Sequence, residues 1–274
     1  MLRWIFLLLC LVTLIASVKA YSQEDPKPLT ENPTAKAISL IKASITALGG
    51  QAYLSIKSEK SQGLITPYRE ITPSSNDIQP DKLGTQVFVD YILLPNKERV
   101  EFKGQGRLFI QSNADKHSWI YDSDAELLRD QTQAQKDRFS RTLRYQVDKI
   151  LRGGWAEPNV EITYLPRQEL WPRQYGEGVK LTYSDSEEAE LYFDLQTKLP
   201  IALRFPKDTH EGQRVKAENR FFKYLDINMV KTPYVVDLFE NGKQVLRINY
   251  DNREFNIPIS DKLFVKPSNV KSLK

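Results

Sequence analysis

The sequence predicts an α+β fold in which helices cover one opening or one face of a curved antiparallel sheet. Three observations carry this prediction. Apolar and polar residues alternate through many short segments, two longer segments carry apolar residues at helical spacing, and Asn241-Gly242 joins two of the alternating segments. Asn-Gly between such segments is the strongest short-range signal of a β-hairpin. Because a single helix interrupts the run of strands, the pattern does not fit a parallel doubly wound sheet.

The first twenty residues have the pattern of a secretory signal peptide. Arg3 is followed by an uncharged, mostly apolar run over residues 4–17, and Val18-Lys19-Ala20 places short residues before a cleavage site. The alternative is a retained membrane anchor, but the run is shorter than the ~20 residues that a span needs. We therefore expect cleavage after Ala20, a flexible lead-in over residues 21–31, and a single domain over residues 32–274 that works in the periplasm or cell envelope.

A first helix is expected to begin at Pro33. Asn32 suits the N-cap, and proline is favourable at the first helical position because its missing N–H would have no partner there. Four side chains form one apolar stripe along this helix: Ile38, Ile41, Ile45 and Leu48. Gly49-Gly50 is expected to end the helix, since glycine adopts the left-handed conformation found there.

The strands expected after this helix have one apolar and one polar face. The apolar faces comprise Val87, Val89, Tyr91 and Leu93; Val100 and Phe102; Trp119 and Tyr121; Val160, Ile162 and Tyr164; Val179, Leu181 and Tyr183; Leu191, Phe193 and Leu195; and Leu246, Ile248 and Tyr250. Asp90, Arg99 and Glu101 are expected on the opposite, polar faces. Residues 67–82 contain three prolines and are expected to form a long polar loop.

A second helix is expected from about Ala134 to Arg152. Its apolar residues recur at helical spacing, charged residues fill the other faces, and Gly153-Gly154 is expected to stop it. The apolar residues are Phe139, Leu143, Val147 and Ile150.

The sequence contains no local pattern of catalytic or metal-binding residues. His117 and His210 are far apart, and neither has a second His or a Cys at metal-ligand spacing. There is no Gly-x-Ser-x-Gly or His-Glu-x-x-His motif, and Gly104-Gln-Gly106 is too short to cradle a phosphate. The acidic groups at residues 122–124 and 185–188 stand where strands end and are expected to be solvated turns. We therefore expect no enzyme, no metal and no cofactor; the competing hypothesis is an exported hydrolase whose Ser-His-Asp triad is assembled from residues distant in the sequence.

The charge and the cysteine content exclude nucleic-acid binding and disulfide bonds. Removal of Arg3 and Lys19 with the signal lowers the net charge from +4 to +2, and a nucleic-acid-binding protein would carry a clustered basic excess instead. The only cysteine, Cys10, lies in the expected signal, so the exported chain has no disulfide and depends on its core for stability.

Aromatic side chains recur on the apolar strand faces, and two interpretations of them stay open. They fill a core, as most aromatics on such faces do, or they line a cavity left by a sheet that curves without closing. The residues concerned are Tyr91, Phe102, Trp119, Tyr121, Tyr183, Phe193 and Phe205.

Two stretches carry a family resemblance. In residues 91–102 a strand ends at a proline and the next strand contains Arg99-x-Glu101, and residues 119–122 read Trp-Ile-Tyr-Asp. This arrangement resembles the periplasmic lipoprotein-carrier family, which comprises LolA and its LolB-like and sorting-protein relatives. The end of the first helix (residues 46–58) and the closing segment (residues 256–267) are similar to the sorting-protein-like members. At Leu94 the chain departs from the well-known carriers, in which an arginine holds the lid, because leucine donates no hydrogen bond.

The resemblance implies an unclosed β-barrel, a lid helix over residues 139–151 and a hydrophobic cavity for acyl chains. The expected function is that of a non-enzymatic exported protein that holds a lipid or the acyl chains of a lipoprotein, for transport or sensing in the cell envelope. The expected partners are that lipid or lipoprotein and an envelope membrane protein; the chain is expected to be a monomer. The alternative is an envelope regulatory or interaction domain of the same fold, with a filled core and no lipid.

Ten side chains are expected to line the cavity. They are Val89, Tyr91, Val100, Phe102, Trp119, Tyr121, Phe139, Leu143, Leu181 and Phe193.

Overall fold

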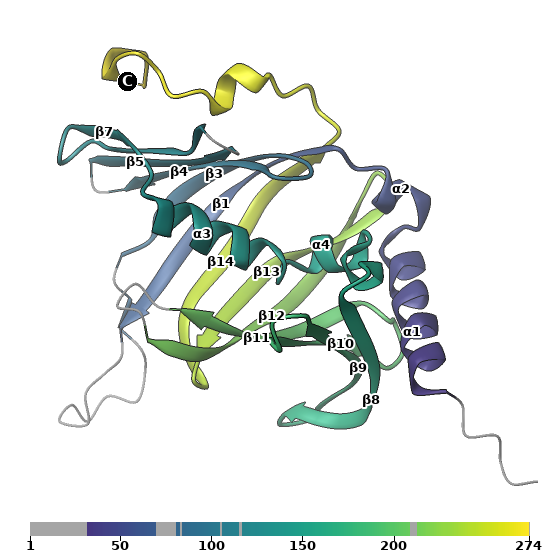
Figure 1. The fold of residues 1–274 in the computed structure, drawn as a ribbon. Coiled ribbons are helices and arrows are strands. Elements are labelled where there is room, and N and C mark those ends of the chain that lie inside the picture. The colour runs from purple at the N-terminus through teal and green to yellow at the C-terminus, as the bar shows by residue number, and fades with distance from the viewer. Residues whose placement is uncertain are drawn as a thin grey trace, which may run out of the picture. The chain divides into compact units, whose positions relative to one another are not determined.

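One long antiparallel sheet carries most of the chain (Figure 1). The computed structural model describes residues 32–69, 81–82, 84–104, 106–114, 117–208 and 213–273, which belong to one compact unit. The expected signal peptide (residues 1–20) and lead-in (residues 21–31) lie outside the described residues.

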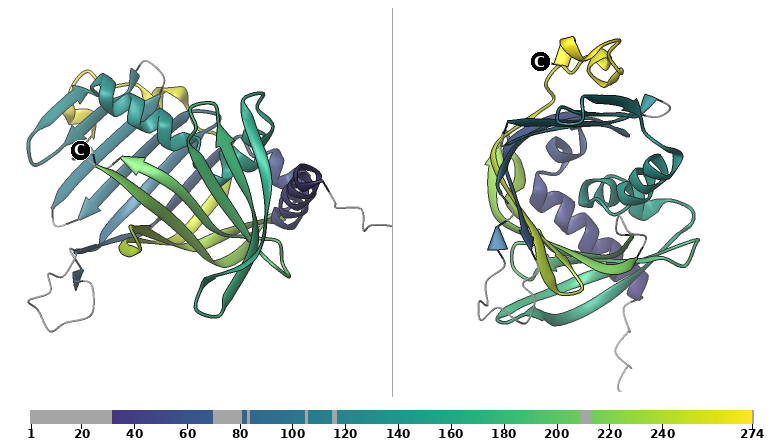
Figure 2. Two further views of the ribbon diagram at one scale, coloured as in Figure 1. Left: turned by 60° about the horizontal axis from the view of Figure 1, so that its bottom comes forward. Right: turned by 90° about the vertical axis from the view of Figure 1, so that its left-hand side faces the viewer.

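The strands follow one another around the sheet as two meanders joined by a single long-range pairing. In hydrogen-bonding order they are β7-β6-β5-β4-β3-β1-β14-β13-β12-β11-β10-β9-β8, and β2 pairs only with the end of β1. The path begins at β7 and ends at β8, so the curved sheet is an unclosed barrel (Figure 2). The bounds are β1 Ser58–Arg69, β2 Asp81–Lys82, β3 Gln86–Leu93, β4 Lys97–Gly104, β5 Arg107–Ala114, β6 Trp119–Asp122, β7 Leu127–Asp130, β8 Val160–Trp171, β9 Gln174–Tyr183, β10 Glu188–Asp194, β11 Pro200–Asp208, β12 Arg214–Ile227, β13 Val230–Glu240 and β14 Lys243–Phe255.

Helices occupy the concave side and one end of the sheet. They are α1 Pro33–Leu48, α2 Gln51–Leu54, α3 Gln133–Leu143 and α4 Val147–Leu151, with the 3₁₀ turn η2 Gly154–Ala156 after α4. Two further 3₁₀ turns, η3 Asp261–Phe264 and η4 Val270–Leu273, lie in the C-terminal segment, on the other side of β3–β7 from α3 (Figures 1 and 2). The predicted α+β class with an unclosed antiparallel sheet is confirmed.

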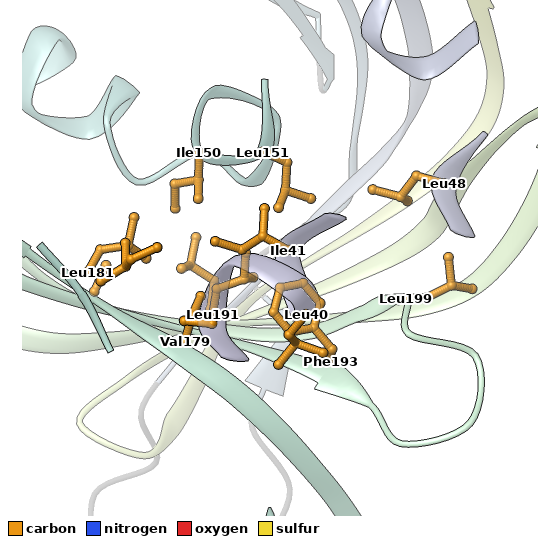
Figure 3. Close-up of a cluster of buried hydrophobic side chains, with 14 of the residues drawn as sticks. Leu40, Ile41, Leu48, Ile150, Leu151, Val179, Leu181, Leu191, Phe193 and Leu199 are labelled. Carbon is orange, nitrogen blue, oxygen red and sulfur yellow. The ribbon is translucent and has the colours of Figure 1, made fainter. Parts of the chain in front are cut away.

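The first helix forms as its local sequence predicts. The Asn32 side chain accepts a hydrogen bond from the Thr34 amide at 2.9 Å, and Gly49 ends the helix at φ 127°. Figure 3 shows Leu40 and Ile41 of α1 beside Leu181, Leu191 and Phe193 of the sheet. This cluster is the main hydrophobic core, and it lies at the β8–β11 end of the sheet.

The second predicted helix is broken into α3 and α4, which corrects the expectation of one helix over residues 134–152. The Tyr145 and Gln146 amides donate to the carbonyls of Thr142 and Leu143, three residues back, and this tighter turn ends α3. Tyr145 is buried there, its ring stacked on Phe205 with 4.9 Å between centroids. Tertiary packing of one aromatic side chain therefore interrupts a segment whose spacing alone favours a continuous helix.

The expected loop over residues 67–82 is also shorter than predicted. Strand β1 continues through Pro67, which pairs with Leu246 of β14, and residues 81–82 form β2; residues 70–80 lie outside the described residues. The predicted hairpin is confirmed, because Asn241 (φ 48°) and Gly242 (φ 82°) turn β13 into β14 with the two positive φ angles that such a tight turn requires.

Candidate ligand cavity

A cavity of about 320 Å³ lies between the concave face of the sheet and the α3–α4 segment. Its walls come from β1, β3, β4 and β11–β14, and its cover comes from residues 142–152. The strands position these side chains because residues directly opposite in an antiparallel pair share a face. Val236 lies opposite both Phe221 and Ile248, so three adjacent strands present apolar neighbours to the same space.

One region of the cavity is apolar. The side chains that form it, which we call the apolar region, are Leu203, Phe205, Phe221, Val236, Leu238 and Ile248. Tyr145 closes the region from above, since its ring stacks on Phe205 and meets Tyr183 edge-on at 5.8 Å.

Another region is lined by three carboxyl groups, which we call the acidic floor: Glu59 of β1, Asp90 of β3 and Glu98 of β4. Strand register brings them together. Ser61 lies opposite both Asp90 and Arg253, and Ile92 lies opposite both Glu59 and Glu98. The floor is thus one patch across β4, β3 and β1, with Arg253 of β14 beside it.

The three carboxyl groups differ in their partners. Glu59 forms an ion pair of 2.7 Å with Arg253, whose guanidinium also donates to the Pro233 carbonyl at 3.0 Å and lies 4.6 Å from the centre of the Tyr250 ring. The Asp90 Oδ1 atom is shielded from solvent and has no hydrogen-bond partner in the part of the chain that the structure describes.

Burial raises the pKa of every carboxyl in the acidic floor. The pKa of Asp90 lies well above its usual value because of burial first and the neighbouring Glu98 and Glu59 charges second. Burial raises the pKa of Glu98 to about 7, against a smaller lowering by its hydrogen bond with Asn113. Burial also raises the pKa of Glu59, although the Arg253 charge opposes the shift. The protonated forms of Asp90 and Glu98 are therefore favoured more than that of an exposed carboxyl group.

The buried Tyr53 side chain connects α2 to the cover of the cavity. The Tyr53 hydroxyl donates to Asp148 Oδ1 at 2.6 Å, and the Arg152 guanidinium lies 4.4 Å from the centre of the Tyr53 ring. Arg152 also donates to the Ile56 carbonyl at 2.9 Å. Burial, reinforced by the Asp148 charge, holds the pKa of Tyr53 well above its usual value.

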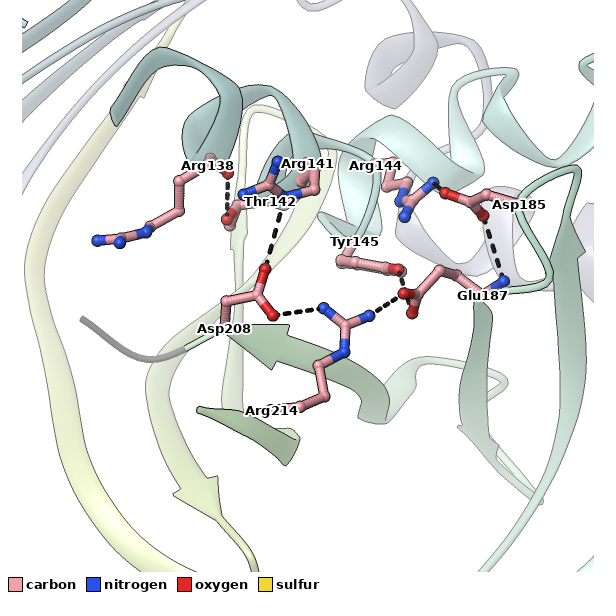
Figure 4. A network of polar contacts seen from close by, with 9 residues as sticks. All are labelled: Arg138, Arg141, Thr142, Arg144, Tyr145, Asp185, Glu187, Asp208 and Arg214. Atoms are coloured by element: carbon pink, nitrogen blue, oxygen red, sulfur yellow. Dashed lines mark hydrogen bonds and ion pairs between the residues drawn. The ribbon is translucent and has the colours of Figure 1, made fainter. Parts of the chain in front are cut away.

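The cover is held to the sheet by an ion-pair network, shown in Figure 4. Arg144 pairs with Asp185 at 2.7 Å, Arg141 lies 3.6 Å from Asp208, and Arg214 bridges Asp208 and Glu187. The arginine hydrogen bonds hold the pKa values of Asp185 and Asp208 below their usual range. Arg141 and Arg144 of the cover thus form ion pairs with the sheet. Leu94 cannot form such a contact, because its side chain has no hydrogen-bond donor.

Four of the predicted cavity residues lie on the outer face of the sheet, which corrects their expected placement. Trp119 donates from Nε1 to the Phe264 carbonyl at 2.8 Å, and Tyr121 packs in a cluster with the C-terminal segment. Register puts Tyr91 opposite Arg99, Arg99 opposite Ser112 and Ser112 opposite Trp119, so these side chains share one face; Val89 is on it as well, opposite Glu101. The C-terminal segment contacts this face at Arg99, Ser112 and Trp119, which explains why Trp119 is buried without lining the cavity.

The other six predicted residues are distributed over three places. Leu181 and Phe193 are fully buried in the main core. Val100 and Phe102 are on the inner face, where Phe102 lines a separate hollow with Gln86 and Phe109, and Phe139 and Leu143 are half-buried on α3. None of the ten predicted residues is among the described residues that line the 320 Å³ cavity.

Sequence reasoning missed the acidic floor because it placed Asp90 on a solvated face. The available signal was the pair Phe88 and Ile92, which flank Asp90 at two residues on either side and mark its face as equally apolar. The opposite choice of faces for β3 would have placed Asp90 inside.

The described residues include no group of three His, Cys, Asp or Glu side chains that could hold a metal ion. His117 is exposed, and His210 lies outside the described residues. In the described segments no helix combines the length and apolar character needed to cross a membrane.

An unclosed antiparallel sheet with a helical cover over a partly apolar cavity defines a half-barrel with an internal cavity. No family model and no curated protein matches the sequence. The structure is similar to that of LolA superfamily protein NE2245 from Nitrosomonas europaea, with a TM-score of 0.50 and 12% identity over 84% of this chain and 97% of that chain. The chain therefore has a LolA-like fold, and the resemblance carried by the sequence is confirmed at the level of the fold.

Two further solved structures match with lower similarity. MucB gives a TM-score of 0.28 and 10% identity over 86% of this chain and 64% of that chain. The Pseudomonas aeruginosa MucA/MucB complex gives a TM-score of 0.27 and 11% identity over 83% and 61%.

Proposed function

We propose that this protein is a non-enzymatic exported binding protein that holds a lipid, or an acyl chain of a lipoprotein, inside its half-barrel for transport or sensing in the cell envelope. The observation that carries the proposal is the 320 Å³ cavity with its apolar region between the cover and the concave face. The signal-like first twenty residues support export to the periplasm or envelope.

The size of the cavity favours a small apolar ligand. Ligand pockets usually measure roughly 300–1,000 Å³, so 320 Å³ suits one alkyl or acyl chain. Each methylene that leaves water for such a space contributes about 0.8 kcal/mol. A chain of moderate length is therefore enough for stable binding without any catalytic group.

A matched pair of variants on one strand tests the proposal. Leu238 lines the cavity, whereas Phe239, the next residue of β13, points to the other side and lies 3.9 Å from the Arg220 guanidinium. Leu238→Trp adds side-chain volume inside the cavity and obstructs it, and Phe239→Trp adds side-chain volume outside it. The probe is the neutral fluorophore N-phenyl-1-naphthylamine, which brightens in apolar surroundings, followed by displacement with 1-dodecanol.

The wild-type protein and Phe239→Trp should give a saturable, dodecanol-sensitive rise in fluorescence, and Leu238→Trp should lose it. A wild-type protein without a saturable signal, or equal binding by both variants, would overturn the proposal. Native mass spectrometry of the protein from its own envelope then identifies the natural ligand. A bare mass together with an absent probe signal would favour the envelope interaction domain instead.

A further inference from the structure

We propose that the acidic floor binds the amino group of an amphiphile whose apolar part occupies the apolar region of the same cavity. This inference rests on the proposed function, and it names the headgroup chemistry that the site selects.

The charges that line the cavity do not balance. Among the described residues they comprise four carboxyl groups, two arginines and one exposed lysine: Glu59, Asp90, Glu98, Asp148, Arg152, Arg253 and Lys231. The phenols of Tyr53, Tyr145, Tyr224 and Tyr250 face the same space, and burial raises the pKa of each. They therefore add no positive charge.

Both arginines are already engaged. Arg253 pairs with Glu59 and donates to the Pro233 carbonyl, and Arg152 donates to the Ile56 carbonyl and lies 3.6 Å from Asp148. Two of the four carboxyl groups therefore remain without an ion pair in the described part of the chain, namely Asp90 and Glu98.

Asp90 supplies the observation that points to a ligand. Asp90 is among the residues that line the cavity, and its Oδ1 atom is shielded from solvent and accepts no hydrogen bond from any described residue. An unsatisfied buried acceptor is unfavourable, and a donor brought by a ligand removes that penalty. A primary ammonium carries three N–H donors and one positive charge, which matches two adjacent carboxyl groups.

The floor disfavours other headgroups. A carboxylate or phosphate brings no positive charge and no N–H donor to Asp90 and Glu98, and it meets their ionised forms with like charge. The described residues do not form a three-ligand metal site, so a metal ion has no cage here. The organic ammonium ion remains as the class that the charge and the donors fit.

The floor and the apolar region are continuous, as an amphiphile requires. Arg253 and Tyr250 lie beside the acidic floor on β14. Ile248, which belongs to the apolar region, precedes Tyr250 by two residues and lies on the same face of the strand. A ligand can therefore place its amino group between Asp90 and Glu98 and extend its chain along β14 toward Val236.

The test compares three ligands of equal chain length as competitors of N-phenyl-1-naphthylamine at pH 7.5: dodecylamine, 1-dodecanol and dodecanoate. We expect the wild-type protein to bind the amine about tenfold or more tighter than the alcohol, and dodecanoate least. A lysophosphatidylethanolamine with a twelve-carbon chain separates an aminolipid headgroup, which bears a phosphate beside the amine, from a simple alkyl amine.

Two variants isolate the carboxyl groups. Asp90→Asn and Glu98→Gln should each reduce the ratio of dodecylamine affinity to dodecanol affinity to less than about threefold. Glu161→Gln, an exposed position of β8 away from the cavity, is the matched control and should keep the wild-type preference. Melting curves establish that each variant is folded, and Glu98→Gln carries the test if Asp90→Asn does not fold.

Equal displacement by all three dodecyl ligands would overturn this inference and leave the proposed function in place. So would an amine preference that survives in both carboxyl variants. Failure of every ligand to displace the probe from the wild-type protein would instead overturn the proposed function.

Discussion

Replacement of Trp119 tests whether this side chain holds the C-terminal segment to the outer face of the sheet. The side chain is fully buried, its indole N–H donates to the Phe264 carbonyl at 2.8 Å, and the Arg99 guanidinium lies 5.3 Å from its ring centre. Phe264 belongs to η3, so Trp119 fixes the C-terminal segment to the outer face of the sheet. We predict that replacing Trp119 loosens this segment and leaves ligand binding intact.

The expected loss in the free energy of unfolding depends on which contacts each replacement of Trp119 removes. Trp119→Ala deletes a fully buried aromatic side chain, and such deletions lower the free energy of unfolding by about 3–5 kcal/mol. Trp119→Phe keeps most of the apolar contact but loses the indole hydrogen bond and some side-chain volume. We expect this variant to lower the free energy of unfolding by about 1–3 kcal/mol. Since domains are stable by roughly 5–15 kcal/mol, the phenylalanine variant should stay folded and open to both assays.

Urea unfolding measures the free energy of unfolding, and limited proteolysis measures release of the C-terminal segment. Trp119→Phe should lose stability and be cleaved faster after residue 256, while its affinity for N-phenyl-1-naphthylamine stays within about twofold of wild type, since Trp119 lies away from the cavity. Trp155→Phe is the control, because Trp155 packs against the main core and not against η3. Loss of probe binding in Trp119→Phe with stability unchanged would refute the placement on the outer face.

Three further changes test the core, the strand pairing and the buried acid. Phe193→Ala should lower the free energy of unfolding by about 3–5 kcal/mol without changing the preference among dodecyl ligands; an altered preference would place Phe193 at the ligand. Gly63→Ala should cost at least about 1–3 kcal/mol in urea unfolding, because a Cβ there would lie 2.0 Å from the Asn249 carbonyl oxygen of β14; a wild-type midpoint would contradict that close approach. Burial raises the folded-state pKa of Glu98 from 4.5 to about 7, so the folded state binds more protons than the unfolded state between these values, and stability falls as pH rises through this window. Glu98→Gln should reduce that decline relative to wild type in melting curves from pH 4 to 8, and parallel curves for the two proteins would count against a raised pKa of Glu98.

Features set by neighbouring residues could be predicted from the sequence. The start of α1 depends on Asn32 and Pro33, its end on Gly49, and the β13–β14 turn on Asn241-Gly242, so in each place the decisive contacts lie within a few residues. The alternation of the strands was predictable for the same reason. What alternation gives is a period of two, and it does not say which of two apolar faces points inward.

The face of β3 was assigned wrongly because both of its faces are apolar. Val89 and Tyr91 lie on the outer side, and Phe88 and Ile92 on the inner side. Local pattern offers no way to choose between them, since the outer face of the neighbouring strands β4–β6 is covered by a segment that lies 145 residues beyond Trp119 in the sequence. The same long-range contact explains why the aromatic motif that carried the family resemblance belongs to the sheet's outer packing and not to its cavity.

Glu59 provides the internal comparison for the two unpaired acids of the floor. It lies on the same inner face and lines the same cavity as Asp90, and it is matched by Arg253 at 2.7 Å. A fold that needed buried carboxyl groups only for packing or register would be more stable with each of them partnered in this way, because an unsatisfied buried acceptor is costly. Asp90 and Glu98 have no such ion pair in the described part of the chain and stand where the apolar region ends. The contrast between one acid with an ion pair and two acids without one, all within one cavity, supports the proposal that a ligand brings a cationic group.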